Sequence, residues 1–421
     1  MSIDDLPDSL LAEILFQLPC ESVTRFKSVS KRWLALISDP SFVNLTRGTL
    51  FFQSEFQHET ENFTMSVEHS GVKSRSFSLS FVPCYQEPIK TDDGGPVVVG
   101  THNDIVLCCA TRCHQREYYI CNPHTKRWVG LPPAPQCQFA FVEVGFLCDA
   151  DYNKKEDDKR KHSSSIFNAY EYRYVVVRIL HTLPCSTRKF EVEIFSSETG
   201  EWRKSVVSYS SGIKGYGASV FCGHSIAYNG MLYWPGYLGV VARMDPFNKN
   251  STTSTGVGDI TIDKFRFTAF DKRVDDHIST EHYRLGMCQG RLRMCHVFVP
   301  LVPRCPTKLI LSIWELKEEE ETAADGGEKW CLIERVSTDQ MVSEDPPITK
   351  WLNSWKYWYV NVLGLDPNNE EIVYLHMLQL IVICNIRTRT LKIARRGAAP
   401  PWIECFPFEL PCWPTPLTNL S

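Results

Sequence analysis

The chain has little of what would direct it to a membrane, to nucleic acid or out of the cell. Its 45 basic and 49 acidic residues give a formal net charge of only −4, so no net charge attracts it to nucleic acid or anionic lipid. No apolar run approaches the ~20 residues that span a bilayer. Asp4 and Asp5 stand where a secretory signal would carry basic residues. We therefore expect a soluble intracellular protein, cytoplasmic or nuclear, that binds neither nucleic acid nor a membrane.

The chain also lacks C-x-x-C pairs, although it contains 17 cysteines. Most of them lie inside apolar runs, as Cys108 and Cys109 do, where a free cysteine behaves as a small hydrophobic residue. The nearest approach to a metal-binding set is Cys109, Cys113, His114 and Cys121, whose spacing fits no common zinc pattern. We therefore predict reduced thiols, with no metal site and no cofactor.

Catalytic motifs are missing as well. The segment Gly217–Phe221 is similar to a nucleophile elbow but lacks the final glycine. Gly215 and Gly217 begin a dinucleotide-like fingerprint, in which Val220 replaces the third glycine. No H-E-x-x-H or Walker sequence is present. The sequence thus predicts a protein that is not an enzyme, although residues far apart in a chain can assemble an active site without such a motif.

The first 45 residues contain an excess of large apolar side chains. The first helix is predicted to open at Pro7, since the missing N–H of proline would be unpaired there anyway, and to end before Pro19. A second helix is expected over Glu21–Val29, and a third, which carries Trp33, stops at Asp39-Pro40. The first helix repeats apolar residues at helical spacing, namely Leu10, Leu11, Ile14, Leu15 and Leu18. A segment this short cannot bury so many apolar side chains alone, so the excess must dock on the rest of the chain or on another protein.

The spacing of these residues resembles an F-box along the whole motif. The matching run begins at Leu6-Pro7, passes through Leu18-Pro19 and Val29-Ser30-Lys31-x-Trp33, and closes at Asp39-Pro40-x-Phe42. The pair Cys20-Glu21 departs from the aliphatic-basic pair expected at this point. Members of this family bind Skp1-type adaptors and so join cullin-based SCF ubiquitin ligases. The resemblance places the F-box at residues 1–45.

The resemblance also implies roles for individual side chains of the F-box. Phe26, Val29 and Trp33 are expected to hold the helices together while contributing at the edge of the adaptor-binding face. The residues expected on or near that face are Leu6, Pro7, Leu10, Ile14, Leu15, Leu18, Pro19 and Val23. The alternative is that the helices only cap the large domain and bury the leucine stripe within the chain.

Beyond about Leu50 the pattern changes to short strands separated by turn residues, and no long helix is evident. A hairpin turn is indicated by Asn229-Gly230 and, more weakly, by Gln289-Gly290. A loose repeat of strand, polar turn and aromatic or apolar residue links Tyr119–Trp128, Ile194–Trp202 and Val382–Leu391. Such recurring hairpins suggest a β-propeller of about six four-stranded blades, with seven also compatible with the strands. We expect Leu50–Phe56 to pair with the C-terminal strands and close the ring.

Residues 46–421 resemble the plant F-box-associated domain, which is kelch-like. The matching pieces occur in the order of that family and include Cys121-Asn122-Pro123, Val144-Gly145-Phe146 and Thr199-Gly200-Glu201-Trp202. The double glycines of true kelch repeats are missing from the strands, because Gly94-Gly95 and Gly326-Gly327 lie in polar loops. The two resemblances imply an α+β multidomain chain, with a small three-helix F-box followed by an all-β propeller.

Together the resemblances imply the substrate-recognition subunit of an SCF-type E3 ubiquitin ligase. The F-box would bind the adaptor, and through it a cullin, while the propeller would bind a protein substrate that the sequence does not identify. Aromatic residues are favoured at binding surfaces, so Trp351 or Trp355 is expected on the substrate-binding face. Two alternatives stay open: a ligand-binding or enzymatic propeller with the helices as a structural cap, and a non-degradative F-box scaffold.

Overall fold

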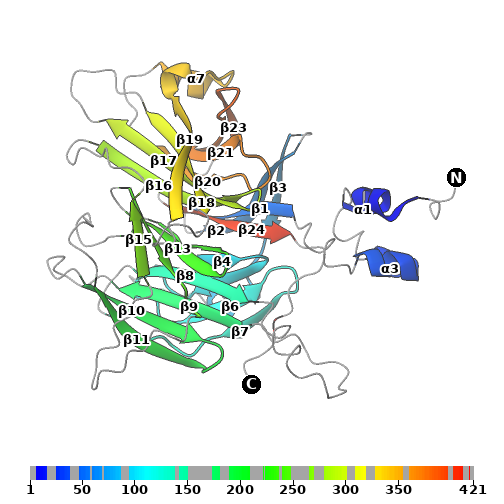
Figure 1. The fold of residues 1–421 in the computed structure, drawn as a ribbon, viewed down its shortest axis with the longest axis vertical. Coiled ribbons are helices and arrows are strands. Elements are labelled where there is room, and N and C mark those ends of the chain that lie inside the picture. Colours follow the sequence, from blue (N-terminus) through cyan, green and yellow to red (C-terminus); the bar gives the residue numbers. More distant parts are fainter. Residues whose placement is uncertain are drawn as a thin grey trace.

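In the computed structural model the chain forms a small helical part and a ring of β-sheets (Figure 1). The structure describes residues 6–16, 25–37, 47–56, 59–68, 71–86, 94–137, 142–149, 173–180, 189–208, 221, 223–236, 239–247, 265–269, 279–300, 309–318, 328–353, 360–396, 402–410 and 417. Strands account for most of these residues, as the short alternating and apolar runs predicted.

Two α-helices make up most of the described N-terminal part. Helix α1 covers Asp8–Phe16 and helix α3 covers Lys31–Ile37, and the two contact each other. Between them, residues 25 and 26 are helical and 27–29 form a turn; the rest of the predicted second helix lies outside the described residues. In the part of the chain that the structure describes, no helix has the length and apolar character needed to span a bilayer.

The described strands form six antiparallel sheets of four strands each. The first sheet has the order β24 (Trp402–Leu410), β1 (Arg47–Phe56), β2 (Glu59–Glu68) and β3 (Gly71–Phe77). The second is β4 (Val97–His102), β5 (Ile105–Cys109), β6 (Tyr118–Asn122) and β7 (Arg127–Gly130). The third is β8 (Val142–Asp149), β9 (Arg173–Leu180), β10 (Lys189–Ser196) and β11 (Glu201–Ser208).

The remaining sheets follow in chain order. The fourth is β12 (Ile226–Tyr228), β13 (Met231–Gly236), β14 (Val240–Met244) and β15 (Phe265–Ala269). The fifth is β16 (Ser279–Cys288), β17 (Arg291–Pro300), β18 (Ile310–Glu318) and β19 (Glu328–Ser337). The sixth is β20 (Val360–Leu365), β21 (Ile372–Met377), β22 (Leu380–Asn385) and β23 (Thr390–Arg396).

These six sheets are the blades of a closed propeller. Contacts run from β24 to β4, β4 to β8, β8 to β12, β13 to β16, β16 to β20 and β20 back to β24. Strand β1 pairs with β24 from Arg47 opposite Leu410 to Glu55 opposite Trp402. The predicted pairing of Leu50–Phe56 with the C-terminal strands is therefore confirmed, and the number of blades is six.

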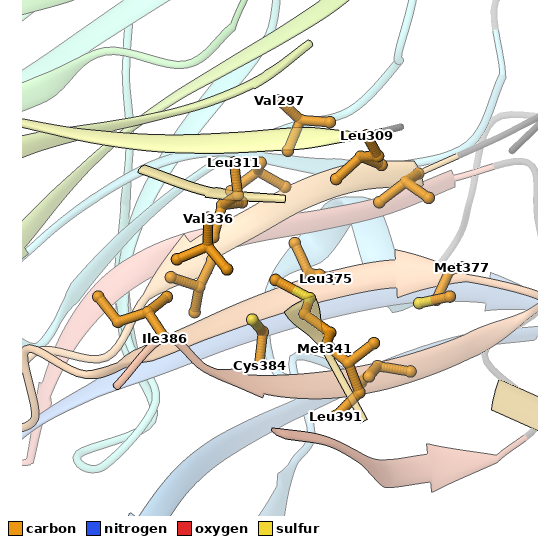
Figure 2. Packing of buried hydrophobic residues seen from close by; sticks show 14 of the residues in the cluster. Val297, Leu309, Leu311, Val336, Met341, Leu375, Met377, Cys384, Ile386 and Leu391 are labelled. Carbon is orange, nitrogen blue, oxygen red and sulfur yellow. The ribbon is translucent and has the colours of Figure 1, made fainter. Parts of the chain in front are cut away.

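The hydrophobic core of the propeller is divided among the blade interfaces. Among the described residues there are six such clusters, one between each pair of neighbouring blades. Figure 2 shows the cluster between the fifth and sixth blades, where Leu311 and Val336 lie opposite Leu375 and Cys384. Because neighbouring blades cover both faces of a sheet, middle strands such as β5 and β21 are buried along their whole length.

Neighbouring blades approach each other closely at two glycines in innermost strands. A Cβ added at Gly145 of β8 would overlap the ring of Trp234 and lie 2.9 Å from Leu232 Cδ1, both in β13 of the next blade. At Gly286 of β16, an added Cβ would lie 3.0 Å from Leu365 Cδ1 of β20. The missing side chain at these positions therefore sets the distance between the sheets.

The sequence repeat marks equivalent hairpins in three blades. Its three copies, Tyr119–Trp128, Ile194–Trp202 and Val382–Leu391, connect the third and fourth strands of their sheets. Asn122 and Asn385 each accept two hydrogen bonds at their Oδ1 atoms, from the backbone N–H groups two and three residues ahead, at 2.8–3.2 Å. The asparagine amide thus closes an Asx turn, which explains why a polar turn recurs at this point.

The two predicted hairpin turns are confirmed and have the same geometry. Asn229 and Gly230 join β12 to β13 with φ values of 48° and 75°, and Gln289 and Gly290 join β16 to β17 with 49° and 73°. Positive φ at both central residues is the requirement of a type I′ turn. Each turn links the first and second strands of its blade.

The apolar segment Phe77–Val82, whose pattern suggests a strand, does not form one beyond its first residue. Strand β3 ends at Phe77, and a turn leads to the short helix α5 at Pro83–Gln86. Leu79 and Val82 are nevertheless buried, in the cluster between the first and second blades. Burial of a connecting turn produced the apolar pattern that suggested a strand.

Candidate functional site

Helix α1 divides its large apolar residues between two sides. Leu11 and Leu15 are fully buried and four residues apart, so they lie on the same side of the helix. Leu10 and Ile14 have the same spacing but are 46% and 45% exposed. The first pair fills the core of the helical part, and the second pair forms an apolar stripe on its surface. The apolar excess of α1 is therefore half core and half surface.

The helical part has a hydrophobic core of its own. Leu11, Leu15, Trp33 and Ile37 form one buried cluster. The ring of Phe26 meets that of Trp33 edge to face, with centroids 5.3 Å apart and an interplanar angle of 79°, an arrangement that aromatic pairs favour. Within the described residues, every member of this cluster comes from residues 11–37. The chain itself therefore buries only part of the leucine stripe, namely Leu11 and Leu15.

Arg32 of α3 fixes the beginning of α1. Its Nε and Nη2 atoms donate to Asp8 Oδ1 at 2.9 and 2.7 Å, and Nη2 also donates to the backbone carbonyl oxygen of Leu6. The carbonyl oxygen of Pro7 accepts the first helical hydrogen bond, from the Leu11 N–H at 3.0 Å. These bonds hold Leu6 and Pro7 at the helix end, where Leu6 is half-buried and Pro7 is exposed.

In the segment Val29–Trp33, the motif residues Val29, Ser30 and Trp33 have different structural roles. Ser30 precedes α3, and its Oγ accepts a hydrogen bond from the Trp33 N–H at 3.2 Å, as a helix N-cap does. Trp33 lies in the core, whereas Val29 is 59% exposed at the corner before the cap. The motif thus combines an exposed apolar residue, a helix cap and a core aromatic residue.

The structure separates the predicted adaptor-facing residues into surface and core. Pro7, Leu10, Ile14 and Val29 are exposed and Leu6 is partly exposed, so a partner could reach all five. They come from α1, its N-terminal end and the turn before α3.

Leu15, predicted on or near the adaptor-binding face, belongs to the core of the helical part. Leu15 is fully buried and Trp33 is 7% exposed, so both serve mainly to hold the helices together. Helical spacing predicts apolar stripes but does not indicate which of two neighbouring stripes faces inward. Leu18, Pro19 and Val23 lie outside the described residues.

Leu34 is an exposed apolar residue that was not among the residues predicted on the adaptor-binding face. This residue of α3 is 46% exposed, beside the buried Trp33. Helical spacing could have indicated its exposure. Trp33 and Ile37 are four residues apart and share the buried side of α3, so Leu34, directly after Trp33, lies on another side of the helix.

The structure corrects one prediction for the propeller. Trp351 belongs to helix α7 (Pro346–Leu352) and is only 7% exposed, in the cluster between the fifth and sixth blades. Trp351 is therefore not the exposed member of the predicted alternative, Trp351 or Trp355, because Ile348 and Trp351 share the buried side of α7. Trp355 lies outside the described residues.

The cysteines of the second blade are part of its core. Cys108, Cys109 and Cys121 are fully buried in β5 and β6. Burial raises the pKa of the Cys109 thiol to about 12, so the thiol stays protonated near neutral pH and is a poor nucleophile. Among the described residues, no three histidine, cysteine, aspartate or glutamate side chains are grouped so that they could hold a metal ion.

Comparison with known families covers both parts of the chain. The F-box domain family matches residues 3–45, and the β-propeller family of F-box proteins similar to At3g26010 matches residues 56–409. The chain belongs to the At3g26010-like F-box proteins. The prediction that an F-box precedes a C-terminal propeller is confirmed for this At3g26010-like protein.

Relatives of this At3g26010-like protein occur in Arabidopsis thaliana. The F-box protein At5g49610 is 27% identical over 54% of this chain and 57% of its own length. The F-box protein At5g07610 is 26% identical over 55% of this chain and 51% of its own length. A third relative, At1g71320, is 27% identical over 92% of this chain and 91% of its own length. The chain thus spans about half the length of the first two and nearly all of the third.

Proposed function

We propose that this protein is the substrate-recognition subunit of an SCF-type E3 ubiquitin ligase. Its F-box binds a Skp1-type adaptor, and through the adaptor a cullin, while its propeller binds a protein target. The observation that carries the proposal is the exposed stripe of Leu10 and Ile14 on a helical part whose core is already filled.

An apolar stripe on a packed helical part favours a protein partner. Burial of apolar surface contributes roughly 25 cal/mol per Å², so covering Leu10, Ile14 and Val29 together would stabilise a complex. Exposed apolar patches of this kind mark interaction sites on soluble proteins. The match of residues 3–45 to the F-box domain supports a Skp1-type adaptor as that partner.

The proposed role requires no catalytic group in this chain. A receptor subunit holds its target close to a conjugating enzyme, so its contribution is an increased effective concentration. The closed propeller that follows the F-box in the chain offers a surface for such a target. We infer a non-catalytic receptor that acts in the cytoplasm, the nucleus or both.

Adaptor binding by the full chain tests the proposal, by calorimetry with a purified Skp1-type adaptor. Leu10→Asp and Ile14→Asp place a charge in the stripe and should weaken binding at least tenfold, because an unpaired carboxylate is costly to bury. Leu378→Asp is the matched control, since Leu378 lies in the turn between β21 and β22 and is also 46% exposed. Adaptor affinity unchanged in both α1 variants would refute the adaptor role.

A reconstituted ubiquitin-transfer assay separates a degradative receptor from a scaffold. Proteins captured by the full chain serve as candidate targets, and the Leu10→Asp variant serves as the control that lacks adaptor binding. Target ubiquitination should depend on an intact stripe. Capture without any ubiquitin transfer would instead identify a non-degradative F-box scaffold.

A further inference from the structure

An ion pair crosses the centre of the propeller. His224 lies just before β12, and its Nε2 contacts Oε2 of Glu404 in β24. The blades that contain β12 and β24 are separated by two other blades in each direction around the ring. The pair therefore links opposite blades, whereas each hydrophobic cluster of the described residues links two neighbouring blades.

Two more blades contribute charged groups to the same place. Glu143 at the start of β8 interacts electrostatically with His224, Glu404 and Arg284, and Arg284 belongs to β16. A Cβ added at Gly223, the neighbour of His224, would lie 3.9 Å from Arg284 Nη1. We call Glu143, His224, Arg284 and Glu404 the axial cluster.

The axial cluster is anchored to surrounding elements. Arg284 Nε donates to the carbonyl oxygen of Val362 in β20 at 3.4 Å, so a fifth blade takes part. The His224 ring packs on the ring of Phe406 in β24, with centroids 4.6 Å apart. The side chains of His224 and Glu404 are 24% and 20% exposed, so solvent screens this pair less than it would screen a surface pair.

The two carboxyl groups of the axial cluster differ in protonation. Burial raises the pKa of Glu143 to about 7; His224 and Arg284 oppose this effect and Glu404 adds to it. Burial also acts to raise the pKa of Glu404, but the charge and hydrogen bond of His224, with Arg284 and Arg112, lower it to about 2. The cluster thus holds one carboxylate at mildly acidic pH and two above neutral pH.

We propose that the axial cluster is a proton-controlled latch that ties opposite blades together. While Glu143 is neutral, His224 and Arg284 both stabilise the single carboxylate of Glu404. When Glu143 ionises, two carboxylates share His224 and Arg284 and repel each other, and the tie across the propeller weakens. The other titratable groups at this place are Arg112 beside Glu404, and His282 and Cys405 beside Arg284.

The direction of the pH effect follows from proton linkage. The pKa of Glu143 is higher in the folded protein than its unfolded value of about 4.3, so the folded state binds more protons between these two values. Stability from this group is fully present at the acidic end and is lost as pH rises through about 7. Glu404 has the opposite shift, and its contribution is lost only as pH falls from about 4.5 toward 2.

Thermal unfolding of the full chain between pH 5.5 and 8.5 tests the latch. The Tm of Glu143→Gln minus that of the wild type should grow as pH rises from 5.5 to about 7 and then level off, because the amide cannot ionise and the folded wild type holds an extra proton only below its raised pKa. Glu404→Gln should lower the Tm over the whole range. Glu191→Gln, at a partly exposed position of β10, is the control and should keep the wild-type pH dependence. A Tm difference between Glu143→Gln and the wild type that stays constant from pH 5.5 to 7 would overturn the proposal.

Amide hydrogen exchange of the wild-type protein is an independent test that needs no variant. After correction for intrinsic exchange rates, protection of β12 and β24 should fall relative to that of β5 as pH rises from 6 to 8, because only the first two strands adjoin the latch. Equal changes in all three strands would also overturn the proposal.

Discussion

At the scale of single residues, Gly145 and Arg178 show how the third blade meets its neighbours. Gly145 leaves the space that Trp234 of the fourth blade occupies. Arg178 and Glu193 form a fully buried ion pair, and Arg178 Nη2 also donates to the carbonyl oxygen of Gln115 in the second blade at 2.6 Å. The interface with the fourth blade thus depends on the absence of a side chain at Gly145. The interface with the second blade depends on the charged side chain of Arg178, which has several hydrogen-bond partners.

Substitution of Gly145 tests how tightly the blades pack. Gly145→Ala should reduce the free energy of unfolding by about 1–3 kcal/mol, because the fully buried Trp234 and Leu232 cannot move away freely. Urea denaturation of the full chain measures the change. Gly95→Ala is the control, since no heavy atom lies within 4 Å of a Cβ added there. Equal losses in the two variants would show that close approach at Gly145 is not the cause.

At the scale of secondary-structure elements, the outer edge of β23 is partly covered by the segment of the same chain that contains Val342 and Asp345. The N–H and carbonyl of Val342 bond to the Arg389 carbonyl and the Leu391 N–H of the β23 hairpin, both at 2.9 Å. The Ile393 N–H donates to Asp345 Oδ2 at 2.8 Å. Covering an edge in this way prevents another chain from pairing with it, so the connection that leads to α7 also protects the sixth blade.

Helix α1 yields a prediction that separates folding from binding. Leu15→Asp places a charge in the helical core, so α1 and α3 should lose their packing and become sensitive to protease, while the propeller stays resistant. Leu10→Asp should leave the helices resistant, because Leu10 is exposed. Both variants should bind the adaptor weakly. Limited proteolysis read by mass spectrometry distinguishes the two causes, and a protease-resistant Leu15→Asp would contradict the assigned core.

Local patterns predicted elements better than they predicted contacts. The polar turn at Asn122 and the turn at Asn229-Gly230 are determined by residues adjacent in the chain, and both were predicted correctly, although the Asx geometry at Asn122 was not. The burial of Leu15 and Trp351 depends on which side of a helix meets another element, which periodicity does not specify. His224 and Glu404 are 180 residues apart, and no spacing in the sequence indicated that they meet. The F-box itself was recognised from the sequence because its motif is local.

At the scale of the whole molecule, the ring depends on one strand from the C-terminal end. Strand β24 is innermost in the first blade and pairs with β1. Phe406 and Phe408 belong to the cluster with the second blade, and Cys405 belongs to the cluster with the sixth. Loss of β24 would therefore open two interfaces at once.

Deletion of residues 402–421 tests this closure. The shortened chain should lose cooperative thermal unfolding and aggregate, because the edge of β1 and two apolar interfaces become exposed. Circular dichroism and size-exclusion chromatography measure both effects. Deletion of residues 418–421 alone is the control, since it keeps β24 and the buried Leu417. A monomeric, cooperatively unfolding 1–401 chain would contradict this role of β24.

The pairing of β1 with β24 also has a consequence for synthesis on the ribosome. The described core of the helical part is complete once residue 37 has emerged, but the propeller cannot close until residue 410 has emerged. Throughout the interval, the nascent chain carries the proposed adaptor-docking stripe without a finished recognition domain. A product of premature termination would therefore carry the proposed adaptor-docking stripe without a closed propeller, and only completed translation joins the two parts.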